Sequence, residues 1–414
     1  MAGIAILGYG TVGSGVYEAL GQNRERLKQI AGSAPYVKRI LDIREFPGDP
    51  AADLITGNFN EILNDGDIRV IVECMGGIEP AYGYTRSAIE RGKHVITSNK
   101  EVVSLYGPEL LALAAKHSVS YLFDASVAGV IPIIRPLTQI LSTDVITEIK
   151  GILNGTTNYI LSQMDNGKES FEQALKKAAA HGYAERDPSD DIDGLDTSRK
   201  LAILLSLTLG LHVDYRKIRT EGIRNITEDD IHFAGRFGYT LKLLAVGKID
   251  SSESVTAITA PFLVKGDSVL SAVRNALNAV VVSGKCMDDV MMYGLGAGKL
   301  PTGAAIISDI VYAVAHEGKN IPHIWSQEPA AINPWEVTPY QRMVRISCLA
   351  GLDPDIIYRH FTRASGVIKD ESKKQLVFFT PHMTEAEFAN TLGEMTTREN
   401  SLALLSAIRI SEAS

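Results

Sequence analysis

The first third of the chain alternates short apolar runs with amphipathic helical patterns. Five buried strands are predicted, at 4–7, 37–43, 70–74, 94–97 and 120–123. Helical patterns lie between them at 14–30 and 81–91, and strands that alternate with helices are typical of a parallel sheet covered on both faces. The pattern therefore predicts a doubly wound α/β domain over residues 1–133.

The pattern changes after Pro136, where strands and helices no longer alternate regularly. Strands are predicted at 145–151, 240–248, 254–261 and 279–282, and a helix at 170–181. This mixed order indicates an α+β domain over residues 134–299. A further helix, within 300–320, is expected to return to the first domain and complete it.

The last quarter of the chain has a different order again. Residues 321–340 are rich in proline, tryptophan and polar side chains, which is typical of a linker. The pattern then predicts strand, helix, two strands, helix and strand, at 342–349, 353–362, 366–369, 375–381, 385–395 and 402–410. This βαββαβ order predicts a ferredoxin-like module over residues 341–414.

Composition and charge disfavour several classes of protein. Of the 414 residues, 45% are apolar and 22% charged, as in ordinary globular proteins. No apolar run reaches the length of a bilayer span, and the N-terminus lacks the basic start of a signal peptide. The net charge of −8, without a dense basic cluster, disfavours nucleic acid as a partner. The cysteines, Cys74, Cys286 and Cys348, are too scattered for a metal site and are expected to be reduced thiols in a cytoplasmic protein.

A glycine-rich turn joins the first predicted strand to the first helix. Gly8, Gly10 and Gly13 follow the order G-x-G-x-x-G in that context. Gly8 permits the tight turn, Gly10 lets the backbone approach a pyrophosphate, and Gly13 lets the helix pack closely on the strand. The pyrophosphate would lie at the helix N-terminus. The motif predicts a Rossmann dinucleotide-binding domain.

The end of the second strand leaves the choice of coenzyme open. An acidic residue there binds the ribose hydroxyls of NAD, whereas an arginine favours the 2′-phosphate of NADP. The sequence offers both, as Asp42 and Arg44.

Other predicted strands end in small or polar residues. Met75 and Gly76 follow the strand at 70–74, and Lys100 stands at the end of the strand at 94–97. Ligands bind at the carboxyl ends of the strands in such sheets. Lys100 is therefore a candidate site residue, with an ordinary surface lysine as the alternative.

The segment from Gly182 to Gly210 is the most unusual in the chain. Six carboxylates precede one lysine, Lys200, and they are Glu185, Asp187, Asp190, Asp191, Asp193 and Asp196. The apolar run 201–209 follows, and a helix that is apolar on every side is normally buried. We expect Asp193 to cap this helix and Lys200 to lie where a solvated loop meets a dry interior.

Spacing suggests what the lysine does. Asp196 and Lys200 are four residues apart and share one helix face. A lysine beside carboxylates at such a place can pass a proton to or from a bound oxygen. The acids could bind a ligand ammonium group, so the pattern favours a small amino acid whose hydroxyl or carbonyl exchanges a proton while a nicotinamide takes or gives hydride. An exposed helix ion pair is the alternative.

A polar turn at 153–158 precedes the next helix. Asn154, Gly155 and Thr156 offer backbone N–H groups and side chains that suit an anion such as a carboxylate. Helix capping by Thr156 or Asn158 is the plainer interpretation, and the two are compatible.

Several motifs together resemble the homoserine dehydrogenase family. They are GYGTVG at 8–13, SNK at 98–100, DASVAGVIPII at 124–134, GILNGTTNYIL at 151–161, GYAERDPSDDIDGLDTSRK at 182–200 and GAGKLPTGAA at 296–305. The resemblance implies interconversion of L-homoserine and L-aspartate 4-semialdehyde with NAD or NADP, in threonine, methionine and isoleucine biosynthesis.

The resemblance also implies residue roles. Lys200 would be the proton donor and acceptor, and Lys100 would orient the substrate and contact the coenzyme. Substrate-binding residues would be Glu185 and Asp196, then Asp190 and Asp191. The coenzyme site would be lined by Thr11, Val12, Gly76, Ser98 and Gly298.

A structural monovalent cation, usually sodium, is a further implication of the resemblance. Its ligands would be the Asp124 carboxylate and the backbone oxygens of Val127, Gly129 and Ile131. The family usually has glutamate where this chain has Asp124.

The tail resembles an ACT regulatory module, which in this family often senses threonine. The Asp-x-Pro-Gly turn usual after its first strand is absent from residues 347–354. Assembly as a homodimer or homotetramer is therefore predicted ahead of threonine inhibition, and an amino-acid effector is the other partner that the resemblance implies.

Two other functions stay open on the sequence. One is a dehydrogenase of the same fold that acts on a different amino acid or semialdehyde, since fold does not determine substrate. The other is an amino-acid sensor without catalytic activity. Lys100, Lys200 and the acidic loop argue against the sensor.

Overall fold

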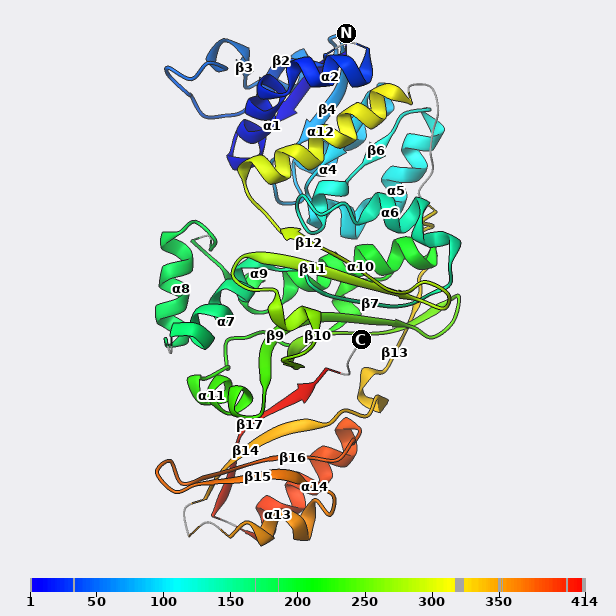
Figure 1. Cartoon of the computed structure of the whole chain (residues 1–414). Helices are drawn as coiled ribbons and strands as arrows, with labels where there is room; N and C mark the ends of the chain where they lie inside the picture. The colour runs from blue at the N-terminus through cyan, green and yellow to red at the C-terminus, as the bar shows by residue number, and fades with distance from the viewer. Residues whose placement is uncertain are drawn as a thin grey trace.

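The computed structural model describes residues 2–32, 34–167, 169–184, 186–316, 324–348, 351, 353–399 and 401–411. These form three units stacked along one axis, with the N-terminal and C-terminal units at opposite ends (Figure 1). In the described part of the chain, no helix combines the length and the apolar character needed to cross a membrane.

Six parallel strands form the sheet of the N-terminal unit, in the spatial order β3-β2-β1-β4-β5-β6. They are β1 (Gly3–Leu7), β2 (Tyr36–Leu41), β3 (Ile55–Thr56), β4 (Ile68–Glu73), β5 (His94–Thr97) and β6 (Tyr121–Leu122). The strand order reverses beside β1, which is where sheets of this kind bind ligands. The predicted Rossmann-type sheet is confirmed, and β3 is a strand that the pattern did not predict.

The helices of this unit include one from far along the chain. They are α1 (Thr11–Gln22), α2 (Arg24–Ala31), α3 (Phe59–Leu63), α4 (Ala81–Glu90), α5 (Lys100–Lys116) and α12 (Lys299–Ala315). The one helix expected at 14–30 is broken at Asn23, whose side-chain amide donates to the Ala19 carbonyl at 2.9 Å. Helix α12 packs against α1 so closely that a Cβ on Gly15 would lie 2.2 Å from the Lys299 carbonyl oxygen.

The middle unit is built on a mixed sheet with helices packed against it. Its strands are β7 (Ile146–Ile152), β8 (Arg219–Thr220), β9 (Tyr239–Ile249), β10 (Ser254–Lys265), β11 (Leu277–Gly284), β12 (Asp288–Leu295) and β13 (Ala331–Asn333). Its helices are α6 (Ile134–Gln139), α7 (Gly155–Gly167), α8 (Phe171–Ala180), α9 (Ser189–Ile192), α10 (Leu195–Leu209) and α11 (Glu228–Arg236). Strands β8 and β12 were not predicted, and β13 lies within the segment 321–340 that was expected to be a linker.

The C-terminal unit has the predicted βαββαβ order. Its elements are β14 (Arg342–Cys348), α13 (Asp355–His360), β15 (Ser365–Asp370), β16 (Gln375–Phe379), α14 (Glu385–Arg398) and β17 (Leu402–Ile410). The strands lie in the order β17-β14-β16-β15, all antiparallel to their neighbours. Strand β17 also pairs in parallel with β10, so the two units share one eleven-stranded sheet.

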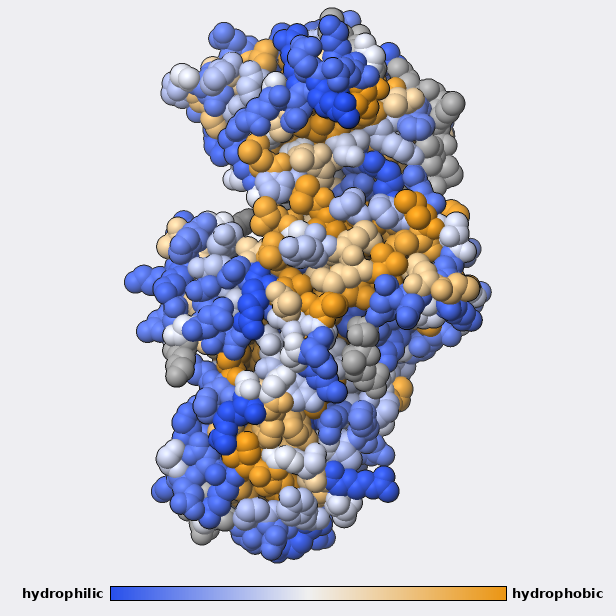
Figure 2. Space-filling model, viewed as in Figure 1, coloured by the Kyte–Doolittle hydropathy of each residue, from blue (hydrophilic) through white to orange (hydrophobic). Residues whose placement is uncertain are grey.

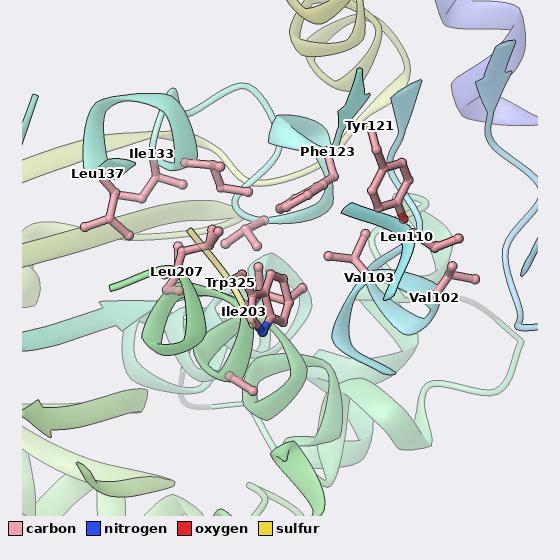
Figure 3. Close-up of a cluster of buried hydrophobic side chains, with 14 of the residues drawn as sticks. Val102, Val103, Leu110, Tyr121, Phe123, Ile133, Leu137, Ile203, Leu207 and Trp325 are labelled. Atoms are coloured by element: carbon pink, nitrogen blue, oxygen red, sulfur yellow. The ribbon is translucent and has the colours of Figure 1, made fainter. Parts of the chain in front are cut away.

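An apolar core joins the N-terminal and middle units. Side chains from α5, α10 and the segment after β6 surround the indole of Trp325 (Figure 3). Trp325 is 5% exposed and stacks on His212, and a Cβ on Gly107 of α5 would come within 2.7 Å of its ring. The chain that follows α12 therefore returns to the place where α5 and α10 meet.

Apolar side chains also lie on the surface of the middle unit. Figure 2 shows them gathered where β11 and β12 lie in Figure 1. Tyr293 and Leu295 of β12 are 64% and 44% exposed. A patch of this kind commonly marks a contact with another protein.

A buried lysine in the middle unit makes the stability depend on pH. Lys242 of β9 is 1% exposed and donates to the Asn158 amide oxygen at 3.0 Å and to the Val273 carbonyl. Burial, and then the charge of Arg274, lower the pKa of Lys242 to about 7. The unfolded chain, in which the lysine pKa is about 10.4, therefore binds more protons between pH 7 and 10.

We expect the free energy of unfolding to rise with pH in that window, by up to about 1.4 kcal/mol per pH unit from this lysine. Lys242→Met should remove this part of the slope. Urea unfolding of both proteins at intervals from pH 6.5 to 9.5 measures it, and parallel pH profiles would contradict the assignment.

Candidate active site

The turn after β1 has the geometry of a dinucleotide site. Gly8 has φ +92°, which favours glycine, and a Cβ on Gly13 would lie 1.9 Å from the Gly8 carbonyl oxygen. Gly10 is the N-cap of α1 and has no side chain to cap it. The first N–H groups of α1, from Thr11 and Val12 onward, are therefore left for an anion.

Asp42 and Arg44 at the end of β2 are bonded to each other. The guanidinium of Arg44 donates to both Asp42 oxygens, at 2.9 and 2.8 Å, and the backbone N–H of Tyr9 donates to Oδ2 at 2.7 Å. The pairing with Arg44 outweighs burial and holds the pKa of Asp42 well below its usual range. The Arg44 side chain is 58% exposed, and its NH2 would lie 3.9 Å from a Cβ on Gly10. Arg44 therefore lies beside the glycine-rich turn.

A buried network orders the ends of β4 and β5. The Glu73 carboxylate accepts from the Met75 backbone N–H at 2.7 Å and from the Thr97 hydroxyl at 2.6 Å. The Asn99 side chain donates to the Gly77 carbonyl at 2.7 Å and caps α5. Met75, Gly76 and Ser98 thus lie in two loops that share one network at the carboxyl edge of the sheet.

Lys100 is the first residue of α5 and reaches from the N-terminal unit to the middle unit. Its Nζ lies 2.9 Å from Asp196 Oδ1, and 37% of its side chain is exposed. The negative charge of Asp196 raises the pKa of Lys100. This ion pair joins the edge of the N-terminal sheet that carries the dinucleotide motif to the acidic segment 182–200.

Helix α10 places Asp196 and Lys200 as their spacing predicts. Lys200 Nζ donates to Asp196 Oδ2 at 2.7 Å and to the Leu153 carbonyl at 2.9 Å, with 11% of its side chain exposed. An ammonium group has three protons, so one remains for a bound ligand. Asp196 therefore bridges the two lysines.

Two further residues complete this cluster. Asn154 precedes α7 and donates from Nδ2 to Asp191 Oδ1 at 2.6 Å and to Asp196 Oδ2 at 2.9 Å. Its own oxygen accepts from the N–H of Thr157 at 2.8 Å, which fixes the amide orientation. Asn154, Asp191, Asp196, Lys100 and Lys200 thus form one group, which we call the lysine–aspartate cluster.

Burial and pairing set the protonation of the two aspartates. Burial alone would raise the pKa of Asp196, but Lys200 and Lys100 outweigh it and hold the pKa well below its usual range. Burial, and then the neighbouring charge of Asp196, raise the pKa of Asp191. Asp191 is therefore the carboxylate of the cluster whose negative charge needs a further cation.

Other predicted residues lie around the cluster or away from it. Thr156 donates from its hydroxyl to the Tyr183 carbonyl at 2.6 Å, and Gly155 begins α7. Asp190 is 53% exposed and pairs with Arg199, so it points away from the lysines. Glu185 lies outside the described residues.

The expected cap of α10 is wrong. Asp193 lies outside the helix and pairs with Arg224 at 2.9 Å, while Gly194, with φ +84°, is the N-cap. A separate turn of helix, α9, precedes it and ends at Ile192. The change of direction at Gly194 turns the Asp193 carboxylate outward.

The segment predicted to hold sodium includes Asp124, which belongs to a cluster of one arginine and two aspartates that the sequence did not predict. The Arg135 guanidinium lies 3.1 Å from Asp124 Oδ2 and also pairs with Asp309 of α12. The Ile131 carbonyl accepts the Ile133 N–H at 2.9 Å, and Gly129, next to Ala128, has φ +59°. Within the described residues, no group of three or more histidine, cysteine, aspartate or glutamate side chains could hold a metal.

Comparison with known proteins assigns both parts of the site to one kind of enzyme. Residues 8–124 match the family model "Homoserine dehydrogenase, NAD binding domain" and residues 132–311 match "Homoserine dehydrogenase". The chain is 40% identical to the homoserine dehydrogenase of Bacillus subtilis over 312 residues, which is 74% of this chain and 72% of that protein.

Solved structures agree with this match. The crystal structure of a homoserine dehydrogenase from Thiobacillus denitrificans superimposes with a TM-score of 0.90 at 31% identity, over 99% of this chain and 98% of that one. The structure of a hyperthermophilic archaeal homoserine dehydrogenase in complex with NADPH superimposes with a TM-score of 0.63 at 25% identity. The superposition covers 75% of this chain and 97% of the archaeal chain.

Proposed function

The chain belongs to the homoserine dehydrogenase family, an oxidoreductase of amino-acid biosynthesis, and we propose that its lysine–aspartate cluster is where L-homoserine and L-aspartate 4-semialdehyde are interconverted. The observation that carries this assignment is Asp196, which binds Lys100 of the N-terminal unit and Lys200 of the middle unit at once. A substrate there would lie next to the edge of the sheet that carries the dinucleotide motif.

The residues after β1, β2, β4 and β5 fit a nicotinamide coenzyme. Gly8, Gly10 and Gly13 leave the backbone open for the pyrophosphate, and the network at Glu73 orders the adjoining loops that carry Met75, Gly76 and Ser98. Gly298, with φ +131°, is the N-cap of α12 on the same unit. The bound coenzyme supplies the hydride acceptor for homoserine oxidation and the donor for the reverse reaction.

Lys200 handles the proton in this proposal. Oxidation of the homoserine hydroxyl releases a proton as well as hydride, and the neutral amine of Lys200 would take up that proton, becoming an ammonium, at the one position of Nζ that Asp196 and Leu153 do not use. In the reverse direction the same ammonium donates to the oxygen that becomes the hydroxyl. Lys100 shares Asp196 and lies on the coenzyme side, where it orients the oxygen of the substrate.

The acidic side of the cluster suits the ammonium group of the substrate. Asp191 is a half-buried carboxylate whose side chain, within the described residues, accepts only from the Asn154 amide, and a substrate ammonium would supply the missing charge. Glu185 remains a predicted second ligand for that group. The start of α7, at Gly155 and Thr156, remains the predicted position for the substrate carboxylate.

Initial-rate assays test the function. Purified protein should reduce NAD or NADP in the presence of L-homoserine, and should act more slowly on L-serine and L-threonine, whose hydroxyls are one carbon closer to the ammonium. Equal rates on those amino acids would favour a broader dehydrogenase. No homoserine-dependent reduction of either coenzyme would favour the sensor.

Arg44 should decide the preference for NADP. Both Asp42 oxygens are occupied by Arg44 and Tyr9, while the guanidinium is more than half exposed beside the turn. We expect Arg44→Gln to raise the KM for NADP about tenfold, because an arginine–phosphate hydrogen bond is charge-assisted, and to leave that for NAD within about twofold. Arg39→Gln, within β2 itself, is the control. Equal changes for both coenzymes would contradict this role.

The sodium site, the oligomeric state and the amino-acid effector stay predictions. Asp124 pairs with Arg135, and the Ile131 carbonyl accepts the Ile133 N–H, so a sodium ion would have to compete with both contacts. The apolar patch on β12 is consistent with a homodimer or homotetramer. The C-terminal unit has the strand order expected of an ACT module, and an amino-acid effector there stays a prediction.

A further inference from the structure

The C-terminal unit is bonded to the middle unit through buried charges as well as strand pairing. In the shared sheet, Phe262 pairs with Arg409 and Leu263 with Ile410. Two arginines of the C-terminal unit make ion pairs across this junction. Arg345 binds Asp230 of α11 at 2.6 Å, and Arg409 binds Glu221 at 2.7 Å.

The Arg409–Glu221 pair joins a buried arginine to a glutamate that is 27% exposed. The Arg409 side chain is 6% exposed, and its two terminal nitrogens donate to the two Glu221 oxygens at 2.7 and 3.2 Å. Its guanidinium lies 4.8 Å from the centre of the Trp335 ring. Burial alone would raise the pKa of Glu221, but the hydrogen bonds and charge of Arg409 hold it below its usual value.

Glu221 belongs to the segment 219–224. This segment contacts α9 and the start of α10, which carry Asp191 and Asp196. The Thr220 hydroxyl is 2.7 Å from that of Ser198 on α10. The Ile223 N–H donates to the Ile192 carbonyl at 2.9 Å, and a Cβ on Gly222 would lie 2.2 Å from the same oxygen. Ile192 directly follows Asp191 in the chain. Asp196 lies two residues after Gly194, the N-cap of α10.

These contacts form a continuous support behind the lysine–aspartate cluster. Glu221 is held on one side by Arg409 of the C-terminal unit and on the other by its N–H, which donates to the Thr259 carbonyl at 2.7 Å. Residues 220–223 contact α9 and the start of α10. The backbone that carries Asp191 therefore rests on a segment whose position depends on a charge from the C-terminal unit.

We propose that Arg409 is a positioning residue for the active site, acting through Glu221 and segment 219–224 to fix α9 and the Asp191 carboxylate. The proposal rests on the function proposed above, because it assigns Asp191 to the substrate ammonium. It gives the C-terminal unit a part in substrate binding that needs no effector.

Loss of the Arg409 charge should loosen α9 more than α10. Helix α10 is held by its own buried apolar face and by the Lys100–Asp196 pair, whereas α9 is four residues long and is held by Ile192. Asp191 would then move relative to Lys200. Substrate binding should weaken while the proton-transfer geometry and the coenzyme site are kept.

The test compares Arg409→Met and Glu221→Gln with Arg345→Met in the full-length protein. Arg345→Met is the matched control, because it removes the other buried cross-junction ion pair without touching segment 219–224. We expect the first two variants to raise the KM for homoserine about tenfold, the size of one charge-assisted hydrogen bond, with kcat and the coenzyme KM within about threefold of the parent. Arg409→Lys should restore part of the affinity.

Hydrogen–deuterium exchange supplies a second readout that needs no turnover. Exchange in peptides covering 189–194 and 219–224 should be faster in Arg409→Met and Glu221→Gln than in Arg345→Met. Unchanged exchange with an unchanged homoserine KM would overturn the proposal, as would equal effects of all three variants. A parent protein without homoserine-dependent activity would overturn the proposed function, and the exchange result would still decide whether Arg409 supports α9.

Discussion

Replacing Lys200 with methionine is expected to lower kcat for homoserine oxidation by about 10²–10⁴-fold, the usual contribution of a positioned acid or base. The Lys200 ammonium is the one donor of the cluster with both a buried stem and a free position toward a ligand. Methionine fills a similar volume but cannot carry a proton. Coenzyme binding should change little, because the glycine-rich turn lies in the other unit.

Two controls separate proton transfer from charge and from folding. Lys200→Arg can still pair with Asp196, but a guanidinium does not deprotonate in proteins, so kcat should stay low while the thermal midpoint is kept. Lys217→Met, at an exposed position shortly after the same helix, should leave both unchanged. Near-normal turnover of Lys200→Met would remove Lys200 from the mechanism.

Much of the fold was predictable because its elements are long and strongly patterned. Buried strands appear as continuous apolar runs, and β1, β4 and β5 lie within two residues of their predicted bounds. The break at Asn23 was missed because the apolar period continues through it: the Asn23 backbone N–H keeps its bond to the Ala19 carbonyl, at 3.1 Å, and the side-chain amide donates to the same oxygen. The two-residue β3 has no period to detect. The join between β10 and β17 depends on tertiary packing, which local patterns do not encode.

The candidate site was predictable where its contacts are local. Asp196 and Lys200 are four residues apart on one helix, so their contact follows from spacing. The contacts of Asp196 with Lys100, and of Lys200 with the Leu153 carbonyl, join distant segments, and only the fold reveals them. Asp193 was misplaced because the left-handed conformation of Gly194 starts α10 one residue later.

Two buried carboxylates can be recognised in the sequence by their apolar surroundings. Asp309 is the only carboxylate within the apolar helix α12, and a lone acid on such a helix needs a partner, which is Arg135. Glu73 likewise ends an otherwise apolar strand. Acids of this kind indicate buried polar networks, although their partners cannot be named without the fold.

Asp196→Asn is expected to cost both stability and activity, since it removes the charge that two lysines share. Lys200 is almost fully buried, and breaking a buried ion pair by removing one partner typically costs about 3–5 kcal/mol. Lys100 is more than a third exposed and adds little to this cost. The two ammonium groups would then repel each other across the substrate position, so kcat/KM should fall by about 10²-fold or more.

The pH dependence of this variant identifies the cause. The lysine charges hold the pKa of Asp196 below that of an unfolded aspartate, so its ionisation stabilises the fold fully above about pH 4 and the contribution is lost as the pH falls through the lowered pKa. The difference in unfolding free energy between the parent and Asp196→Asn should thus be constant from pH 5 to 8 and shrink in more acid solution. Asp191→Asn is the matched control, because the pKa of Asp191 is raised and removing its charge should not destabilise the fold at neutral pH. A gap between the parent and Asp196→Asn that persists undiminished in strong acid would show that shape, and not charge, holds the two lysines together.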